Sequence, residues 1–214
     1  MSTILEKKRQ SDTIPPPPVI TGGNGGGDDG SGDGSSFPVS KAQVGLWILM
    51  GTIVMLFGGL SSAYIVLRGV PSWENIVIPP ILWLNTAILL ASSATIEAAR
   101  RSLSHGRLQG MRTWLLISGG FGLAFLAGQL VAWRQLVAAG VYLPSTHHSA
   151  FFYVLTGLHG VHLLGGLAGL SYVLSKALKM RIDPIKDESL KLCATYWHFM
   201  DGLWVYLFVL LVLA

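Results

Sequence analysis

The sequence predicts an all-α polytopic membrane protein, a bundle of five transmembrane helices. Hydrophobic residues make up 51% of the 214 residues, charged residues only 12%, and the mean hydropathy is +0.54, a balance far from that of soluble domains. Because backbone polar groups find no partner in lipid, each apolar window long enough to cross a bilayer is expected to be a helix. Five windows free of Lys and Arg meet this length, at residues 44–67, 76–96, 113–133, 150–175 and 192–214.

The chain before the first window has a different composition. Residues 1–40 include the runs PPPP and GGNGGGDDGSGDGSS, which offer too little apolar surface to offset the entropy lost on ordering. We therefore expect a disordered cytoplasmic tail at 1–40, followed by a transmembrane domain at 41–214.

The basic residues predict the orientation in the membrane. All of the 15 Lys and Arg residues except Arg68 and Arg134 precede the first window or lie in the second and fourth connections between windows. In a five-helix protein these segments share one side, and the positive-inside rule places that side in the cytoplasm, with the C-terminus outside. The net charge of +4 is thus a topology signal and predicts no nucleic-acid binding. Arg68 and Arg134, on the other side, are candidate contacts for lipid headgroups.

Two of the windows carry ionisable residues at depths where these are costly. His159 and His162 lie three residues apart in TGLHGVHLLGG, and His198 and Asp201 lie in YWHFMDGLW. Residues at this spacing share a helical face, so we expect one structural polar network in which Asp201 accepts a hydrogen bond from His162, His159 or His198. The single cysteine, Cys193, excludes a cysteine-built metal site, and no metal site is predicted.

Small residues recur at four-residue spacing in the third and fourth windows. Gly122, Gly128, Gly165 and Gly169 each follow or precede another small residue by four positions. Such rows allow helix backbones to approach closely within lipid. We expect these glycines to be helix-packing positions, some of them against another subunit.

Four segments of the sequence resemble subunit III of the haem-copper terminal oxidases, in the short five-helix bacterial form. They are LWLNTAILLASS at 82–93, LAGQLVAW at 126–133, FFYVLTGLHGVHLLGG at 151–166 and YWHFMDGLWVYLFVLL at 196–211. They occur in the family's order, and the last two together are the most specific.

The resemblance implies a noncatalytic core subunit of an aerobic respiratory complex, most simply cytochrome c oxidase, in the bacterial cytoplasmic (inner) membrane. In that family, haem and copper belong to subunits I and II, which reduce oxygen with electrons from cytochrome c or quinol and pump protons. Subunit III packs on subunit I, holds phospholipid and sustains turnover. The resemblance therefore predicts no cofactor in this chain except bound lipid, and subunits I and II as its partners.

This sequence departs from the family at two positions. Many members carry a carboxylate in the middle of the helix that matches residues 44–67, where this chain has Ile53, and another near LAGQLVAW, where it has Ala132. A role in collecting protons through those acids is weakened, whereas the structural and lipid-holding roles are not.

Two other functions remain open at the level of the sequence. One is a subunit III-like accessory protein of a quinol oxidase or a nitric oxide reductase, which would share the architecture. The other, of a different class, is a free-standing electron carrier in which the histidines ligate haem b.

Overall fold

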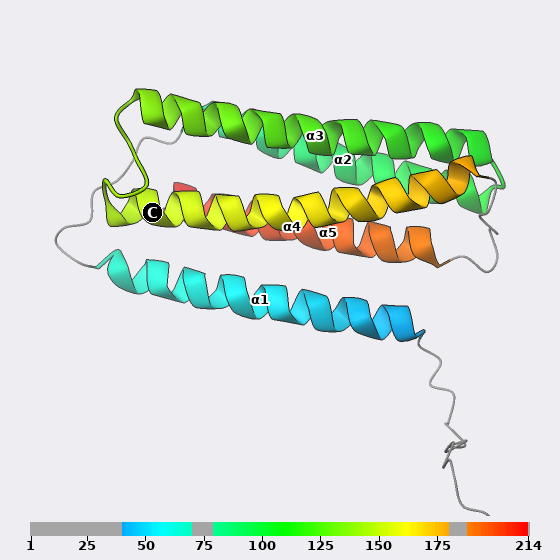
Figure 1. The fold of residues 1–214 in the computed structure, drawn as a ribbon, viewed down its shortest axis with the longest axis horizontal. Coiled ribbons are helices and arrows are strands. Elements are labelled where there is room, and N and C mark those ends of the chain that lie inside the picture. Colours follow the sequence, from blue (N-terminus) through cyan, green and yellow to red (C-terminus); the bar gives the residue numbers. More distant parts are fainter. Residues whose placement is uncertain (1–39, 70–78, 180–187, 214) are drawn as a thin grey trace, which may run out of the picture. The chain divides into compact units, whose positions relative to one another are not determined.

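The computed structural model describes residues 40–69, 79–179 and 188–213, and these residues are helical with short connections (Figure 1). The helices are α1 (Lys41–Leu67), α2 (Ile81–Ser104), α3 (Leu108–Ala138), α4 (His147–Leu178) and α5 (Ser189–Val212). Within the described residues there is no β-strand, and each helix is long and apolar enough to cross a membrane. The predicted fold class, an all-α bundle of five transmembrane helices, is confirmed.

The helices extend beyond most of the apolar windows. α3 continues past Arg134, and α4 continues past Lys176, because long cationic side chains can reach the polar membrane surface while their backbone stays helical. α2 begins five residues later than predicted, at Ile81. Pro79 and Pro80 precede it, and proline restricts the residue before it and supplies no backbone N–H. Except for Ser40, the predicted tail lies outside the described residues.

The helix ends follow local sequence signals. The Ser40 hydroxyl accepts a hydrogen bond from the backbone N–H of Gln43 at 3.3 Å, and Thr146 and Ser149 form a reciprocal capping box at the start of α4, so both helices begin at side chains that satisfy free N–H groups. Gly106, with φ of 70°, lies in the three-residue connection between α2 and α3. Only glycine adopts this conformation without strain, and it lets α3 turn back along α2.

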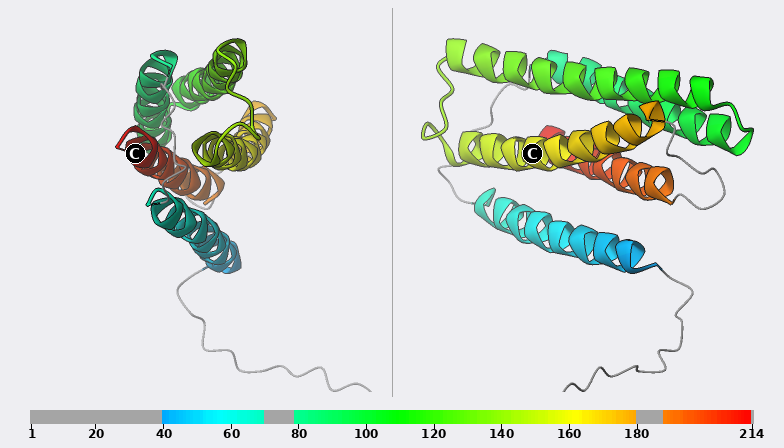
Figure 2. Two further views of the ribbon diagram at one scale, coloured as in Figure 1. Left: turned by 90° about the vertical axis from the view of Figure 1, so that its left-hand side faces the viewer. Right: turned by 45° about the vertical axis from the view of Figure 1, so that its right-hand side comes forward.

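α4 and α5 lie between α1 and the α2–α3 hairpin (Figures 1 and 2). Successive helices are antiparallel (Figure 1). α2 packs on α3 and α5, α3 also packs on α4, and α4 packs on α5. α1 contacts only α4 and α5 among the described helices, so its outer surface is widely exposed, as at Met55. The main core therefore lies among α2, α3, α4 and α5.

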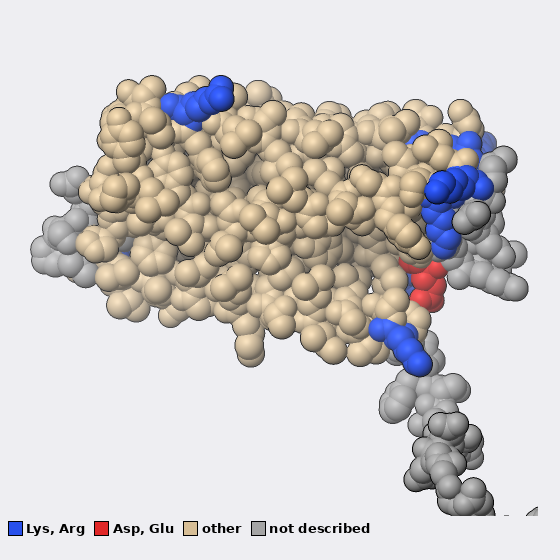
Figure 3. Space-filling model, viewed as in Figure 1, with Lys and Arg blue, Asp and Glu red and all other residues tan. Residues whose placement is uncertain are grey.

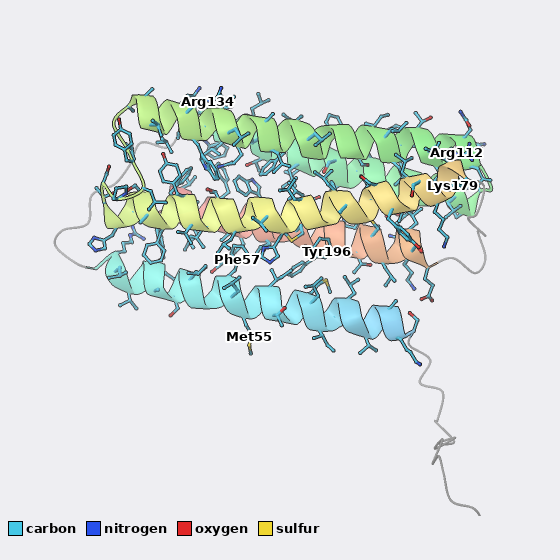
Figure 4. All side chains as sticks on the ribbon, in the orientation of Figure 1. Met55, Phe57, Arg112, Arg134, Lys179 and Tyr196 are labelled. Carbon is cyan, nitrogen blue, oxygen red and sulfur yellow. The ribbon has the colours of Figure 1, made fainter. Side chains whose placement is uncertain are left out.

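The charged side chains of the described residues separate by end. Lys and Arg gather at one end of the bundle (Figure 3), where Figure 4 labels Arg112 and Lys179, whereas Arg134 lies near the other end (Figure 4). Arg68 follows the last residue of α1 at the same end as Arg134. The clustering of cations deduced from the sequence is therefore present in the structure; which end faces the cytoplasm remains a prediction.

Candidate functional site

An apolar groove opens where the first half of α1 stands beside α4 and α5. Its volume is about 470 Å³. All three helices contribute to its lining, and α4 contributes three glycines. The lining residues are Ala42, Gly45, Leu46, Leu49, Gly165, Gly166, Gly169, Tyr172, Val173, Ser189, Leu192, Cys193 and Tyr196. Since this lining is almost entirely hydrocarbon, the groove suits an apolar ligand such as an acyl chain.

Tyr196 closes the inner end of the groove. Its hydroxyl donates a hydrogen bond to the backbone carbonyl of His162 at 3.0 Å, and a Cβ added at Gly166 would lie 3.1 Å from its ring. Figure 4 shows Tyr196 and Phe57 in the space between α1 and the α4–α5 pair. The tyrosine ring therefore packs on Gly166 and forms part of the lining of the groove.

The four predicted packing glycines fall into two groups. A Cβ added at Gly122 would lie 3.0 Å from the Trp197 ring, and one at Gly128 would collide with the Asn85 amide, 2.8 Å from its Cγ. These two glycines pack helices together. By contrast, a Cβ at Gly165 would approach only the Tyr196 hydroxyl at 4.0 Å, and one at Gly169 would meet nothing within 4 Å. Gly165 and Gly169 line the groove instead of a helix contact in this chain.

The two histidines of α4 face different neighbours. His159 is fully buried, with its ring centroid 5.0 Å from that of Trp204 and 5.8 Å from that of Phe125. His162 lies toward α1, 5.8 Å from the Phe57 ring, and its Nδ1 is 2.7 Å from the carbonyl of Leu158 in its own helix. Residues three apart in a helix point in directions that differ by about 60°. Here that difference places His159 against α3 and α5, and His162 against α1.

Asp201 lies inside the bundle without the predicted histidine partner. Its side chain is buried, and no hydrogen bond of ordinary geometry from the described residues reaches either carboxyl oxygen. His162 bonds within α4, His159 has no bonded ring nitrogen, and His198 bonds to Ser93 of α2 at 2.6 Å. The Ser93 hydroxyl also lies beside the Asp201 carboxyl group. The four residues are therefore not joined to one another by hydrogen bonds in this chain.

Polar contacts that the sequence analysis missed connect α2 to its neighbours. The indole N–H groups of Trp197 and Trp204 donate to the hydroxyls of Ser92 and Thr86 at 2.9 and 3.0 Å. Thr95 bonds to Ser118 of α3 at 2.7 Å. The available signal was the run of hydroxyl residues within an otherwise apolar window, since such side chains bond across helices in lipid. Gln129 was also missed; it is buried, and its amide has no partner in the described part of the chain.

The family model for cytochrome c oxidase subunit III matches residues 68–213. This chain belongs to that family. It is 30% identical over 179 residues to the probable cytochrome c oxidase subunit 3 of Mycobacterium leprae (strain TN), which covers 80% of this chain and 87% of that protein. It is also similar to cytochrome c oxidase subunit 3 of Thermostichus vulcanus, 31% identical over 176 residues, 78% of this chain and 85% of that one.

A further relative comes from a quinol-oxidising enzyme. The chain is 28% identical over 174 residues to the cytochrome bo(3) ubiquinol oxidase subunit 3 of Pseudomonas putida, with 79% of this chain and 84% of that protein covered. These relatives, the family match and the helical membrane fold identify the chain as a subunit III of a haem-copper oxidase. The resemblance deduced from the four sequence segments is confirmed.

The geometry of the α4 histidines does not fit a haem held by this subunit III. A haem ligated by both would need the two rings to reach its iron from opposite faces of one open site, whereas His159 is enclosed by Phe125 and Trp204 and His162 faces Phe57. That haem and copper belong to partner subunits remains a prediction.

The two cations opposite the main cluster are positioned as the lipid prediction requires. Arg68 follows α1, Arg134 lies in the last two turns of α3, and both side chains are exposed. Exposed guanidinium groups near the ends of membrane helices can reach lipid phosphates. Headgroup binding by Arg68 and Arg134 remains a proposal.

Proposed function

We propose that this chain is a noncatalytic subunit that packs on subunit I, beside subunit II, of an oxidase in the bacterial inner membrane. Its N-terminus would be cytoplasmic and its C-terminus periplasmic. The haem and copper centres would lie in the partner subunits, which would take electrons from cytochrome c and couple oxygen reduction to proton pumping. Support comes from the family match at residues 68–213 and from relatives named as oxidase subunits.

Within this complex, the chain's own contribution would be to hold lipid. The single observation that carries this proposal is the groove between α1, α4 and α5, whose volume is about 470 Å³ and whose lining is apolar. α1 contacts the rest of the described bundle only through α4 and α5. An acyl chain in the groove would therefore fill the space beside the contacts that α1 makes with these two helices. A bound lipid that stabilises the folded arrangement adds to its stability by mass action.

Purification of the tagged chain from native membranes tests the assignment to an oxidase. We expect haem-bearing subunits to co-purify in a fixed ratio, with oxygen consumption, and the separated chain to show neither a Soret band nor oxygen consumption. Stoichiometric haem b in the separated chain would contradict the proposal. Co-purification with an enzyme that reduces nitric oxide, or that oxidises quinol alone, would favour the corresponding accessory role.

Substitution of Gly169 by leucine tests the lipid site. A Cβ at Gly169 meets no atom within 4 Å, so the larger side chain should enter the groove without disturbing the helices. We expect at least one fewer lipid per chain by native mass spectrometry, with helicity unchanged. Gly120, on α3 and equally free of contacts, provides the control Gly120→Leu, which should retain the lipid. Equal lipid content in both variants would show that the groove is not the lipid site.

A further inference from the structure

A strip of three polar side chains lies on the outer face of α2 and α5, on the other side of α5 from the groove. Ser93 and Glu97 of α2 meet His198 of α5, and we call these three residues the α2–α5 polar strip. The Ser93 hydroxyl is 2.6 Å from His198 Nδ1, and His198 Nε2 is 3.9 Å from Glu97 Oε2. The strip leads from the arginine-rich end of α2 toward the buried carboxyl group of Asp201, beside Ser93.

The strip lies within the membrane-spanning part of both helices. The second apolar window was predicted to end at residue 96, but α2 continues to Ser104, so Glu97 lies about 10 Å from that end at 1.5 Å per residue. His198 lies about 14 Å from the start of α5 at Ser189 by the same rise. Because the hydrocarbon core is about 30 Å thick, His198 is well inside it.

These side chains are not enclosed by the chain itself. The side chains of His198 and Glu97 are 38% and 35% exposed. Arg100 balances Glu97 at 2.8 Å, but His198 Nε2 is too far from Glu97 for a hydrogen bond, and no other partner for this nitrogen occurs in the described part of the chain. Lipid tails supply no donor or acceptor, so a half-exposed imidazole facing them is costly.

The surface beside the strip permits a close protein contact. Ala94 on α2 and Gly202 on α5 are exposed, and a Cβ at Gly202 would meet nothing within 4 Å. Small residues let another helix backbone approach, and hydroxyl or amide side chains then bond across the contact. A single hydroxyl placed between His198 Nε2 and Glu97 could bond to both, because the gap of 3.9 Å is spanned by two hydrogen bonds of ordinary length that meet at an angle.

We infer that the α2–α5 polar strip is the surface on which a transmembrane helix of another oxidase subunit packs, with a Ser, Thr, Asn or Gln side chain directed at His198 and Glu97. This inference rests on the proposed function in one respect, the membership of the chain in a multi-subunit oxidase. It assigns the docking face to α2 and α5, whereas the groove on the far side of α5 is left for lipid.

Photo-crosslinking in native membranes tests the docking face. A photoreactive phenylalanine analogue placed at Ala94 or Gly202 should form an adduct with a membrane-spanning peptide that contains a Ser, Thr, Asn or Gln residue. The same analogue at Met55, on the outer face of α1 with 81% exposure, should form mainly lipid adducts. Adducts with lipid alone at both Ala94 and Gly202 would overturn the inference.

The identity of the crosslinked protein separates the two proposals. An adduct with a transmembrane helix of a haem-bearing oxidase subunit supports both. An adduct with a transmembrane helix of an unrelated membrane protein contradicts the proposed function while the strip still acts as a docking face for protein. Lipid adducts alone, in membranes from which the tagged chain still co-purifies with oxidase subunits, overturn the docking face and leave the proposed function intact.

Two substitutions at His198 provide a second test, because packing and hydrogen bonding can be separated there. His198→Phe removes the hydrogen bonds and keeps a ring, and it should reduce retention of the partner subunit in a detergent titration roughly fivefold, as expected for loss of an interhelical hydrogen bond in lipid. His198→Gln keeps donor and acceptor groups and should largely restore retention. Equal loss in both variants, or no loss in either, would contradict the role given to the strip.

Discussion

Replacement of Gly128 by leucine is expected to prevent α2 and α3 from assembling. A single Cβ at this position would collide with the amide of Asn85, 2.8 Å from its Cγ. Asn85 is 1% exposed and its amide N–H donates to the Phe125 carbonyl of α3 at 3.5 Å, so a leucine at position 128 would have to displace this buried amide or push the helices apart. Overpacking of this kind costs about 1–3 kcal/mol for small additions, which sets the expected loss for Gly128→Ala. The leucine variant should not reach a folded state in membranes.

Gly120 provides the matched control for this prediction. It lies on the same helix, two turns away, and a Cβ there meets nothing within 4 Å. Gly120→Ala should leave the free energy of unfolding unchanged or raise it by up to about 1 kcal/mol through helix propensity. Unfolding in sodium dodecyl sulfate, followed by circular dichroism, measures both variants. If Asn85→Ala does not relieve the loss caused by Gly128→Ala, the assigned contact is not its cause.

Replacement of Trp197 by alanine is expected to produce the largest loss among side-chain truncations. Its side chain is fully buried, donates to Ser92 of α2 at 2.9 Å, lies over Gly122 of α3 and approaches Gly166 of α4. Truncation of a buried tryptophan costs about 3–5 kcal/mol in soluble proteins. The lower end applies here, because removal of apolar atoms within lipid forfeits packing without a transfer from water.

Two further variants divide the loss at Trp197 into its parts. Trp197→Phe keeps most of the ring volume and gives up the hydrogen bond to Ser92, so the expected loss is about 1 kcal/mol. Trp47→Ala on α1, where the side chain is 59% exposed, removes the same number of atoms from the surface. It should change the free energy of unfolding little. A loss at Trp47 equal to that at Trp197 would show that burial among α2, α3 and α4 is not the reason.

The histidine–aspartate motifs show where inference from sequence reached its limit. The motifs correctly indicated the family, because their residue order is specific. Their contacts were not predictable, because each depends on which face of a helix meets which neighbour. His159 and His162 are close in sequence and separate in space, and His198 pairs with Ser93, a residue 105 positions away in the chain. That pairing depends on the rotation of α5 about its own axis, which turns His198 toward α2. No local sequence pattern specifies this rotation.

The glycines show the same division more simply. Four-residue spacing predicted helix packing at Gly122, Gly128, Gly165 and Gly169, but the structure places a close neighbour only over the first two. The Trp197 ring fills the space over Gly122 and the Asn85 amide fills the space over Gly128, whereas Gly165 and Gly169 border an open groove. A glycine permits a close contact but does not determine which group makes that contact.

The sequence by itself determined the number of membrane helices, the clustering of cations at one end and the family. These properties depend on the length and charge of contiguous segments, and the bilayer imposes them on each segment separately. The tertiary structure alone decided that α1 lies at the edge of the bundle, that a groove separates its first half from α4 and α5, and that Ser93, Glu97 and His198 form one strip. Those features depend on the relative rotation and separation of helices, which small differences in packing among many side chains fix together.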